Sequence, residues 1–314
     1  MIKRQGIEIY FDGEDYIHES DLGFLVSHHK LFNPYDLVGN SKLFTAEYSP
    51  KIGDTVFDLG AGTGTESIFL SQLVGETGRI FAIEADPIVY RRLEKSVKLS
   101  SQKNVVTINC AIGQIESSQY LNQISEEGQG NYLSSSPLTD KTIKVSVVSL
   151  DSIFEKFKIE KVNLMKMNIE GSEFNALLGL KQNLYKVDNF VISCHDFLEG
   201  SEFKTYDRVK SFLQDQDFTV CRAPENLKKP WESWYLYAYK NSVDTSLKNN
   251  APKRRNAQIE YLIESLDYTM RITENLKLEN KLLAESLDNL KSSRSHKITS
   301  IIISIFTFIK SISR

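Results

Sequence analysis

Three glycines at two-residue spacing follow an apolar run and an acid, in Asp58-Leu59-Gly60-Ala61-Gly62-Thr63-Gly64. Glycines between a strand and a helix let the backbone turn sharply and approach a ligand closely. A nicotinamide-dinucleotide fingerprint would place its third glycine at position 65, which is Thr65. The Asp58 carboxylate would repel a pyrophosphate but can pair with the ammonium of a methionine-like group. The turn therefore favours S-adenosylmethionine, and we assign Asp58, Gly60, Ala61, Gly62 and Gly64 to its binding. The alternative is a structural turn that binds no ligand.

Two further segments suit the rest of such a cofactor. Glu84 and Ala85 follow the next apolar run, where a carboxylate can accept two hydrogen bonds from ribose hydroxyls. Cys110 and Ala111 follow the run after that, and small residues there leave room for an adenine ring. We assign all four to cofactor binding. The alternative for Glu84 is a surface acid at the end of a strand.

Candidate catalytic groups lie after two later apolar runs. Asn168 and Glu170 follow the strand predicted at 162–167, and His195 and Asp196 follow the strand predicted at 190–194. In an open sheet of this kind ligands bind beyond the carboxyl ends of the strands, so these four side chains are expected beside the cofactor.

Methyl transfer to a hydroxyl needs a group that removes the hydroxyl proton, and histidine is the side chain best suited near neutral pH. We predict that His195 is the base, oriented by Asp196 or Glu170. Alternatively, His195 only bonds a neighbouring loop, and Glu170 only favours the positive end of a helix dipole. Glu173 is interpreted as a first-turn helix acid rather than a catalytic group.

The elements that must position these residues alternate along the chain. Apolar strands separated by helices predict an α/β fold, with a Rossmann-like, seven-stranded, mostly parallel sheet and helices on both faces. The strands are expected at 55–59, 79–84, 104–109, 162–167, 190–194, 218–222 and 234–240, and the helices at 65–73, 87–99, 152–157, 172–184 and 203–214.

Other segments have weaker signals. Residues 142–150 alternate like a strand with one exposed face, and Asp151 is the expected N-cap of the helix at 152–157. Residues 115–140, rich in Ser, Gln and Gly, are expected to form a mobile loop over the site. We divide the chain into a cap or lead-in at 1–50, a catalytic domain at 51–240, a linker at 241–256 and a C-terminal helical tail.

Taken together, these residues resemble the FkbM-type family of class I S-adenosylmethionine-dependent methyltransferases. The resemblance covers residues 50–240 and is carried by Val56 to Gly64, Phe81 to Pro87, Asn109 to Gly113, Val148 to Ile153 and Leu164 to Glu173. The first segment is shared by all class I methyltransferases, whereas Leu-Asp-Ser and Glu-Gly-x-Glu narrow the resemblance to this family. The resemblance implies an O-methyltransferase of sugars or other natural-product hydroxyls.

One departure from the family pattern concerns metal. The family has Asp where this chain has Asn168, and some related sugar O-methyltransferases bind magnesium near this strand end. Replacing a carboxylate by an amide weakens a site for a hard cation. We therefore assign no metal ligands and expect activity without a divalent metal.

Composition narrows the partners and the location. The 314 residues carry 38 basic and 41 acidic side chains, so no basic excess points to nucleic acid as the acceptor. The three cysteines share no metal or redox spacing, and the first residues lack the apolar core of a signal peptide. We expect a cytoplasmic protein.

The C-terminal tail has two parts. Residues 257–292 carry apolar side chains at 3–4 spacing from Ile259 to Leu290, which predicts a helix that forms a homodimer or docks on its own domain. Residues 293–314 form an apolar segment with a polar stripe and basic flanks. Within it, 298–314 suits peripheral contact with the inner membrane face or a buried dimer helix.

The expected acceptor is a sugar or glycan, such as a surface polysaccharide. Residues 294–299 also resemble the Ser-x-x-Lys-Ile-Thr tails of bacterial glycan-assembly glycosyltransferases. Two other hypotheses stay open at this point. One is a catalytically weak, cofactor-binding scaffold of a glycan-assembly complex, and the other is an O-methyltransferase of a lipid or small metabolite.

Overall fold

The computed structural model describes residues 2–4, 7–33, 43–126, 128–198, 200, 203–226 and 229–240. The chain divides into two compact units, Met1–Asn241 and Ser242–Arg314. The expected linker at 241–256, the helix at 257–292 and the tail at 293–314 lie outside the described residues, so the dimer and membrane predictions stay predictions.

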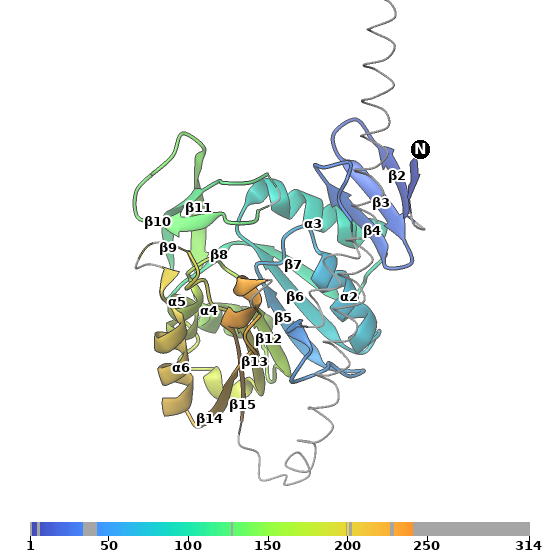
Figure 1. Cartoon of the computed structure of the whole chain (residues 1–314). Helices are drawn as coiled ribbons and strands as arrows, with labels where there is room; N and C mark the ends of the chain where they lie inside the picture. The colour runs from blue at the N-terminus through green and yellow to red at the C-terminus, as the bar shows by residue number, and fades with distance from the viewer. Residues whose placement is uncertain are drawn as a thin grey trace, which may run out of the picture. The chain divides into compact units, whose positions relative to one another are not determined.

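A seven-stranded sheet forms the centre of the first unit, in the order β14-β15-β13-β12-β5-β6-β7 (Figure 1). All neighbouring pairs are parallel except those made by β15, which runs antiparallel to both β13 and β14. This confirms the predicted Rossmann-like sheet. The strands are β5 (Thr55–Leu59), β6 (Arg79–Glu84), β7 (Val105–Asn109), β12 (Leu164–Met167), β13 (Asn189–Ser193), β14 (Phe218–Arg222) and β15 (Tyr235–Lys240).

Helices cover both faces of this sheet, because successive side chains of each buried strand point to opposite sides. In β6, Phe81 and Ile83 join the large core cluster beneath α4 (Leu150–Phe157), α5 (Glu173–Leu178) and α6 (Tyr206–Asp215). Ala82 faces the other way, against Leu93 of α3 (Pro87–Leu99). The helix α2 (Thr65–Val74) also contacts β5 and β6.

The strand order reverses between β5 and β12, which is where open α/β sheets bind ligands. From β5 the chain proceeds to β6 and β7 on one side, and from β12 to β13 on the other. The loops after β5 and β12 meet at the reversal, where the Asn168 N–H donates to the Leu59 carbonyl at 3.0 Å. The fold therefore brings the glycine turn and the candidate catalytic loop together.

The region expected as a mobile loop at 115–140 contains two strands, so that expectation is wrong. A second sheet has the order β10-β9-β11-β8, formed by Tyr132–Ser134, Ser117–Asn122, Thr142–Val148 and Ala111–Ile112. The connection between β9 and β10 is tied down by Asn131, whose Oδ1 accepts from the backbone N–H of Ile124 and of Ser125. The strand predicted at 142–150 is confirmed as β11, but it belongs to this second sheet.

The described part of residues 1–50 includes a four-stranded antiparallel sheet of β1 (Ile2–Arg4), β2 (Ile7–Phe11), β3 (Tyr16–Ser20) and β4 (Gly23–Ser27). It packs against α3 through β4. The backbone N–H of Val26 donates to Ser96 Oγ at 2.9 Å, and that of Phe24 donates to Ser100 Oγ at 2.8 Å.

Several helix boundaries differ from the prediction, and α6 begins at Tyr206 rather than at 203. Ser149, not Asp151, caps α4, since its Oγ accepts from the backbone N–H of Ser152 at 3.1 Å. The Asp151 carboxylate instead accepts from the backbone N–H groups of Gln182 and Asn183. The helix predicted at 172–184 is shorter, because α5 ends at Leu178 and the short 3-10 helix η1 (Leu184–Lys186) follows a turn.

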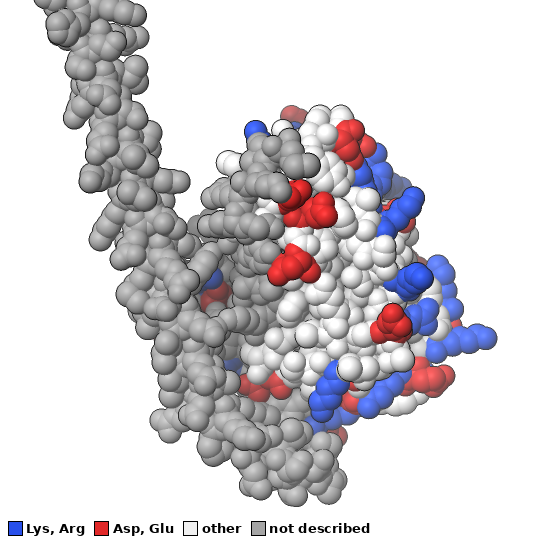
Figure 2. Space-filling model, turned by 90° about the vertical axis from the view of Figure 1, so that its right-hand side faces the viewer, with Lys and Arg blue, Asp and Glu red and all other residues white. Residues whose placement is uncertain are grey.

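Among the described residues no helix is long and apolar enough to span a bilayer. The face seen in Figure 2 carries interspersed acidic and basic side chains and a broad uncharged area.

Candidate active site

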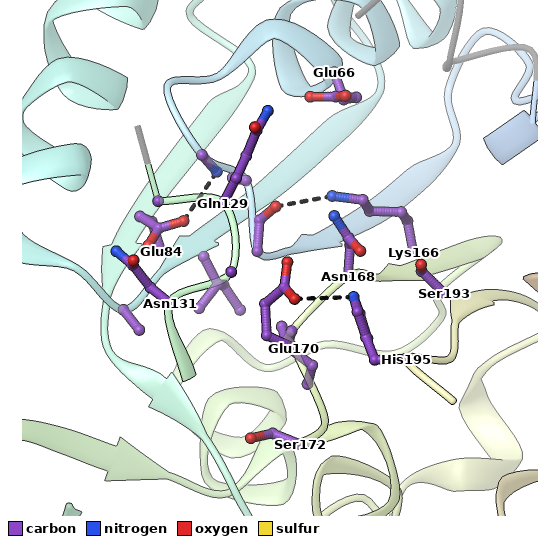
Figure 3. Close-up of a pocket in the computed structure, with 18 of the residues that line it drawn as sticks. Glu66, Glu84, Gln129, Asn131, Lys166, Asn168, Glu170, Ser172, Ser193 and His195 are labelled. Atoms are coloured by element: carbon purple, nitrogen blue, oxygen red, sulfur yellow. Dashed lines mark hydrogen bonds and ion pairs between the residues drawn. The ribbon is translucent and has the colours of Figure 1, made fainter. Parts of the chain in front are cut away.

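A cavity of about 560 Å³ opens at the carboxyl ends of the central strands (Figure 3). Its volume lies within the range of roughly 300–1,000 Å³ that is usual for small-molecule sites. The glycine turn after β5, the ends of β6, β12 and β13 and the 128–131 connection all contribute to its wall. The cavity therefore coincides with the point where the strand order reverses.

The glycine turn is shaped by two close approaches. Gly60 has φ +75°, and a Cβ there would lie 2.0 Å from the Asn168 carbonyl oxygen, so no side chain fits. Gly64 has φ +98°, and a Cβ there would lie 2.7 Å from Leu93 Cδ1 of α3. Gly60, Ala61 and Gly62 line the cavity, whereas Gly64 does not. The position of Gly64 assigns it to packing between the turn and α3 rather than to direct cofactor contact.

Glu84 ends β6 with its carboxylate at the cavity wall. Its Oε2 accepts from the Gly62 backbone N–H and its Oε1 accepts from the Asp86 backbone N–H, both at 2.9 Å. Burial raises the pKa of Glu84 to about 7, although these two N–H groups oppose the shift. Each carboxylate oxygen has more than one lone-pair site, so both can still accept from a ligand hydroxyl.

The neighbouring wall is small and apolar. Beside Glu84 the cavity is lined by Ala85, Cys110 and Ala111, the residues that we assigned to the cofactor together with Glu84. Burial raises the pKa of the Cys110 thiol to about 12, so this sulfur is neutral and a poor nucleophile. Asn131 closes this side, and its Nδ2 donates to Asp86 Oδ2 at 3.1 Å.

Asp58 does not line the cavity, so the expected direct contact with the cofactor is not what the geometry offers. Its carboxylate is fully buried, with Oδ1 2.8 Å from Lys166 Nζ and Oδ2 accepting from Ser67 Oγ at 2.6 Å. Lys166 lies directly opposite Asp58 in the pairing of β12 with β5. Lys166 does line the cavity, and its Nζ also donates to the Gly60 carbonyl at 2.9 Å.

His195 lies between two carboxylates. Its Nδ1 is 2.9 Å from Glu173 Oε1. Its Nε2 is 3.2 Å from Glu170 Oε2, the contact that Figure 3 marks. Glu173 is fully buried and its other oxygen accepts from Thr205 Oγ1 at 3.2 Å. Burial would lower the pKa of His195, but the charges of Glu173 and Glu170 outweigh it, so the pKa lies above its ordinary value.

The orienting partner is therefore not Asp196. The Asp196 carboxylate accepts from the backbone N–H groups of Thr205 and Tyr206, where it holds the start of α6. Glu173 does occupy the first turn of α5, as expected, but it also bonds His195. Sequence reasoning missed this second role, because the Glu-Gly-x-Glu spacing alone does not show that its last acid points back to the site.

The loop after β12 holds Glu170 in an uncommon backbone conformation. Glu170 has φ +50° and Gly171 has φ +96°, and the left-handed region is sparsely populated by residues other than glycine. Asn168 lines the cavity, and its carbonyl lies against Gly60. The turn thus directs the Glu170 carboxylate toward His195 at the cavity wall.

Several lining residues were not singled out from the sequence, and four of them bring charge or aromatic surface to the cavity. Lys166 and Glu66 bring opposite charges to the end of the cavity near α2, and Phe197 and Trp231 are aromatic. A lysine inside an otherwise apolar strand was the available signal for Lys166. Trp231 lies in the 3-10 helix η3 (Pro230–Trp234), 46% exposed, and no spacing pattern marked it.

In the part of the chain that the structure describes, no three His, Cys, Asp or Glu side chains form a group that could hold a metal ion. The amide of Asn168 occupies the position where the resemblance would have placed an acid. The expected independence of divalent metal stays a prediction.

Comparison with known proteins agrees with this geometry. Residues 58–220, just over half of the chain, match the model of the Methyltransferase FkbM domain. The chain therefore belongs to the FkbM family of S-adenosylmethionine-dependent methyltransferases.

Individual relatives are distant. The chain is 24% identical over 180 residues to the hexuronic acid methyltransferase AglP of Haloferax volcanii, covering 54% of this chain and 70% of that protein. It is 30% identical over 136 residues to a probable cobalt-precorrin-6B C(15)-methyltransferase (decarboxylating) of Sulfolobus acidocaldarius, covering 43% and 65%. A crystal structure of methyltransferase FkbM from Methylobacillus flagellatus matches with a TM-score of 0.42 and 17% identity, over 60% of this chain and 44% of that one.

Proposed function

We propose that this protein transfers a methyl group from S-adenosylmethionine to a hydroxyl of a sugar or glycan. The observation that carries the proposal is the buried His195 imidazole, whose Nδ1 is held by Glu173 while its Nε2 lies at the cavity wall. A histidine held in this way beside a cofactor crevice is suited to remove a hydroxyl proton.

The residues present fit the cofactor. The Glu84 carboxylate suits the ribose hydroxyls, and the small side chains of Cys110 and Ala111 leave room for a flat ring beside it. The cavity also contains a buried hydroxyl, Thr65 Oγ1, that has no hydrogen-bond partner in the protein. Buried polar groups are nearly always paired, so this atom favours a polar ligand in the cavity.

The cofactor, when bound, supplies a methyl group on a positively charged sulfur. The protein's part is to align the acceptor hydroxyl and to take its proton. In the neutral form of the ring, with Nδ1–H donated to Glu173, the lone pair of His195 is on Nε2, where it can accept the hydroxyl proton. Glu170 is 3.2 Å from Nε2 in this structure, so the hydroxyl must take its place or insert beside it. The resulting imidazolium is stabilised by the Glu173 carboxylate.

A sugar acceptor is supported by the mouth of the cavity. Trp231 and Phe197 line it and remain 46% and 42% exposed. The flat apolar faces of these two aromatic side chains suit the apolar face of a sugar ring. The similarity to a hexuronic acid methyltransferase supports the same substrate class.

A second candidate function is a cofactor-binding scaffold with little catalytic activity. The amide of Asn168 favours it, because the resemblance implies an acid at that position. The intact group of His195, Glu170 and Glu173 favours the enzyme. Methylation of a lipid or small metabolite uses the same cofactor site and differs only in the acceptor.

The test is to incubate the full-length protein with S-adenosylmethionine and a panel of nucleotide-sugars, oligosaccharides and lipids, and to weigh the products. We expect a sugar that has gained one methyl group. His195→Ala should lower turnover by roughly 10²–10⁴ with little change in cofactor affinity. Cofactor binding with no methylated product in any class would favour the scaffold, and a methylated lipid would refute the sugar assignment.

A further inference from the structure

The end of the cavity opposite Cys110 is polar and charged. When a ribose lies at Glu84 and the adenine beside Cys110, the rest of the cofactor must pass over the glycine turn. Beyond that turn the wall is made by Thr65, Glu66 and Lys166. Figure 3 shows the last two on the side of the cavity away from Glu84. The amino-acid end of S-adenosylmethionine, which carries one carboxylate and one ammonium, would then face these three residues.

Lys166 places a positive charge at this end. Its ammonium is buried against Asp58 and the Gly60 carbonyl, and these contacts use two of its three N–H donors. The Phe44 ring lies 5.1 Å from Nζ and lines the same part of the cavity. Burial would lower the pKa of Lys166, but Asp58 and Glu66 outweigh it and the pKa is raised, so the group stays charged.

Thr65 is an independent sign of a ligand here. It is the first residue of the ten-residue helix α2, where backbone N–H groups and the helix dipole favour an anion. The side chain is only 3% exposed and lines the cavity, yet its Oγ1 has no partner. A carboxylate at this helix end would satisfy that hydroxyl.

Glu66 is the negative counterpart. It follows Thr65 in the first turn of α2 and lines the cavity near Lys166. Burial raises its pKa to about 7, against the opposing charge of Lys166. An ammonium beside it would favour the charged carboxylate.

We propose that Thr65 and Lys166 bind the carboxylate of the cofactor's amino-acid end, and that Glu66 binds its ammonium. This inference rests on the proposed function, since it concerns the same cofactor site. It replaces the direct Asp58 contact expected from the glycine motif, because Asp58 acts instead by holding Lys166 in place.

The test compares two ligands that differ only at this end. S-adenosylhomocysteine carries the amino acid, and 5′-methylthioadenosine lacks it. Calorimetry on the full-length protein should show that Thr65→Val and Glu66→Gln each lower the affinity for S-adenosylhomocysteine by roughly tenfold to hundredfold. This is the range for a lost charge-assisted hydrogen bond. The affinity for 5′-methylthioadenosine should change less than about twofold. The matched control is Glu84→Gln, which should lower the affinity for both ligands equally, because both carry the ribose.

Lys166→Met leaves Asp58 buried without its partner and can fail to fold, so the double variant Asp58→Asn with Lys166→Met is the version to measure. Equal losses for both ligands in the Thr65 and Glu66 variants, or no loss for either, would overturn the inference. A wild-type protein that binds neither ligand would overturn the proposed function itself, which is a distinct result.

Proton release gives a second readout. Near pH 7, S-adenosylhomocysteine should release more protons than 5′-methylthioadenosine, because only the first brings an ammonium to Glu66. Glu66→Gln should abolish that difference. A difference that persists in this variant would place the ammonium elsewhere.

Discussion

At the scale of single residues, the candidate base was predictable from the sequence and its partner was not. His195 follows a buried strand, which places it at the ligand edge of the sheet. Asp196 is adjacent in sequence, but its carboxylate turns away to hold the start of α6. Glu173 reaches His195 from another element, and such a contact depends on the course of the 168–173 loop, which no spacing rule supplies.

The charge of Glu173 is expected to set the pH dependence of turnover. Because the pKa of His195 is raised, the neutral, proton-accepting form becomes populated only at a pH above 6.5, the ordinary pKa of histidine. Glu173→Gln keeps a hydrogen-bond acceptor for Nδ1–H but removes the charge, so the rising limb of kcat against pH should move to lower pH and kcat should fall. Asp196→Asn is the comparison, and we expect it to cost stability and to move the limb less, because the charge of Asp196 raises the pKa of His195 less than that of Glu173 does. If the pH dependence of kcat is the same in Glu173→Gln as in the wild type, the charge of Glu173 does not set the pKa of His195.

The exposed indole of Trp231 should serve the acceptor and not the cofactor. Trp231→Ala is expected to raise KM for the sugar by roughly 5- to 150-fold, the range for a lost aromatic stack of about 1–3 kcal/mol by analogy with base stacking. The affinity for S-adenosylhomocysteine should stay the same. Tyr185→Ala removes another exposed aromatic side chain, remote from the cavity, and should change neither constant. A Trp231 variant with unchanged KM would argue against this platform.

Most of the residues that the sequence assigned to the cofactor line one cavity, because they are neighbours within short motifs. Gly60, Gly62 and Glu84 meet at one wall, as a turn after β5 and a strand end on β6 must. Asp58 was misjudged because its partner Lys166 comes from β12, more than a hundred residues later. Only the strand register shows that the two charges neutralise each other.

At the scale of elements, the bounds of strands and helices were predicted best where a single sequence pattern marks each end. The bounds of β5, β6 and α3 were predicted without error, because apolar runs fix the strands and Asp86 with Pro87 fixes the start of the helix. The strands β9 and β10 were missed, since Ser, Gln and Gly between 115 and 140 obscure the two-residue alternation. The four strands before residue 30 were not predicted either, although Ile7 and Ile9 of β2 alternate with less buried side chains as in a strand with one buried face.

The junction between the glycine turn and α3 gives an element-scale prediction. Gly64→Ala adds a Cβ 2.7 Å from Leu93 at φ +98°, whereas Gly13→Ala adds one at φ +106° with no atom within 4 Å. Both variants carry the backbone cost, so the difference between them reports the clash alone. We expect Gly64→Ala to lower the free energy of unfolding by about 1–3 kcal/mol more than Gly13→Ala. Equal urea midpoints would contradict the close packing at this junction.

At the scale of the whole molecule, activity without a divalent metal is the expectation to test. Methyl transfer should survive EDTA, because the neutral amide of Asn168 is a weak ligand for a hard cation. Activity measured with and without EDTA, and after adding magnesium, decides the point. A complete loss that magnesium restores would show that a metal site exists.

The division of the chain predicts that its two units can be separated. Every residue assigned here to cofactor binding or catalysis lies in Met1–Asn241. Removing residues 257–314 should therefore leave S-adenosylhomocysteine affinity unchanged, while sedimentation reports whether a dimer is lost. A large loss of affinity would mean that the second unit completes the site.

One arginine connects parts of the first unit that share no motif. Arg92 of α3 donates from Nε to Asp15 of the N-terminal sheet at 2.8 Å, and from Nη1 to the Glu126 carbonyl at 2.5 Å. Glu126 belongs to the connection that continues into the 128–131 wall of the cavity. A movement of that wall would therefore pull on the Arg92 side chain, which also holds Asp15 of the N-terminal sheet. The N-terminal sheet is therefore expected to affect the rate at which the demethylated cofactor is released. Substitutions in this sheet should then change the turnover rate while every catalytic side chain stays the same.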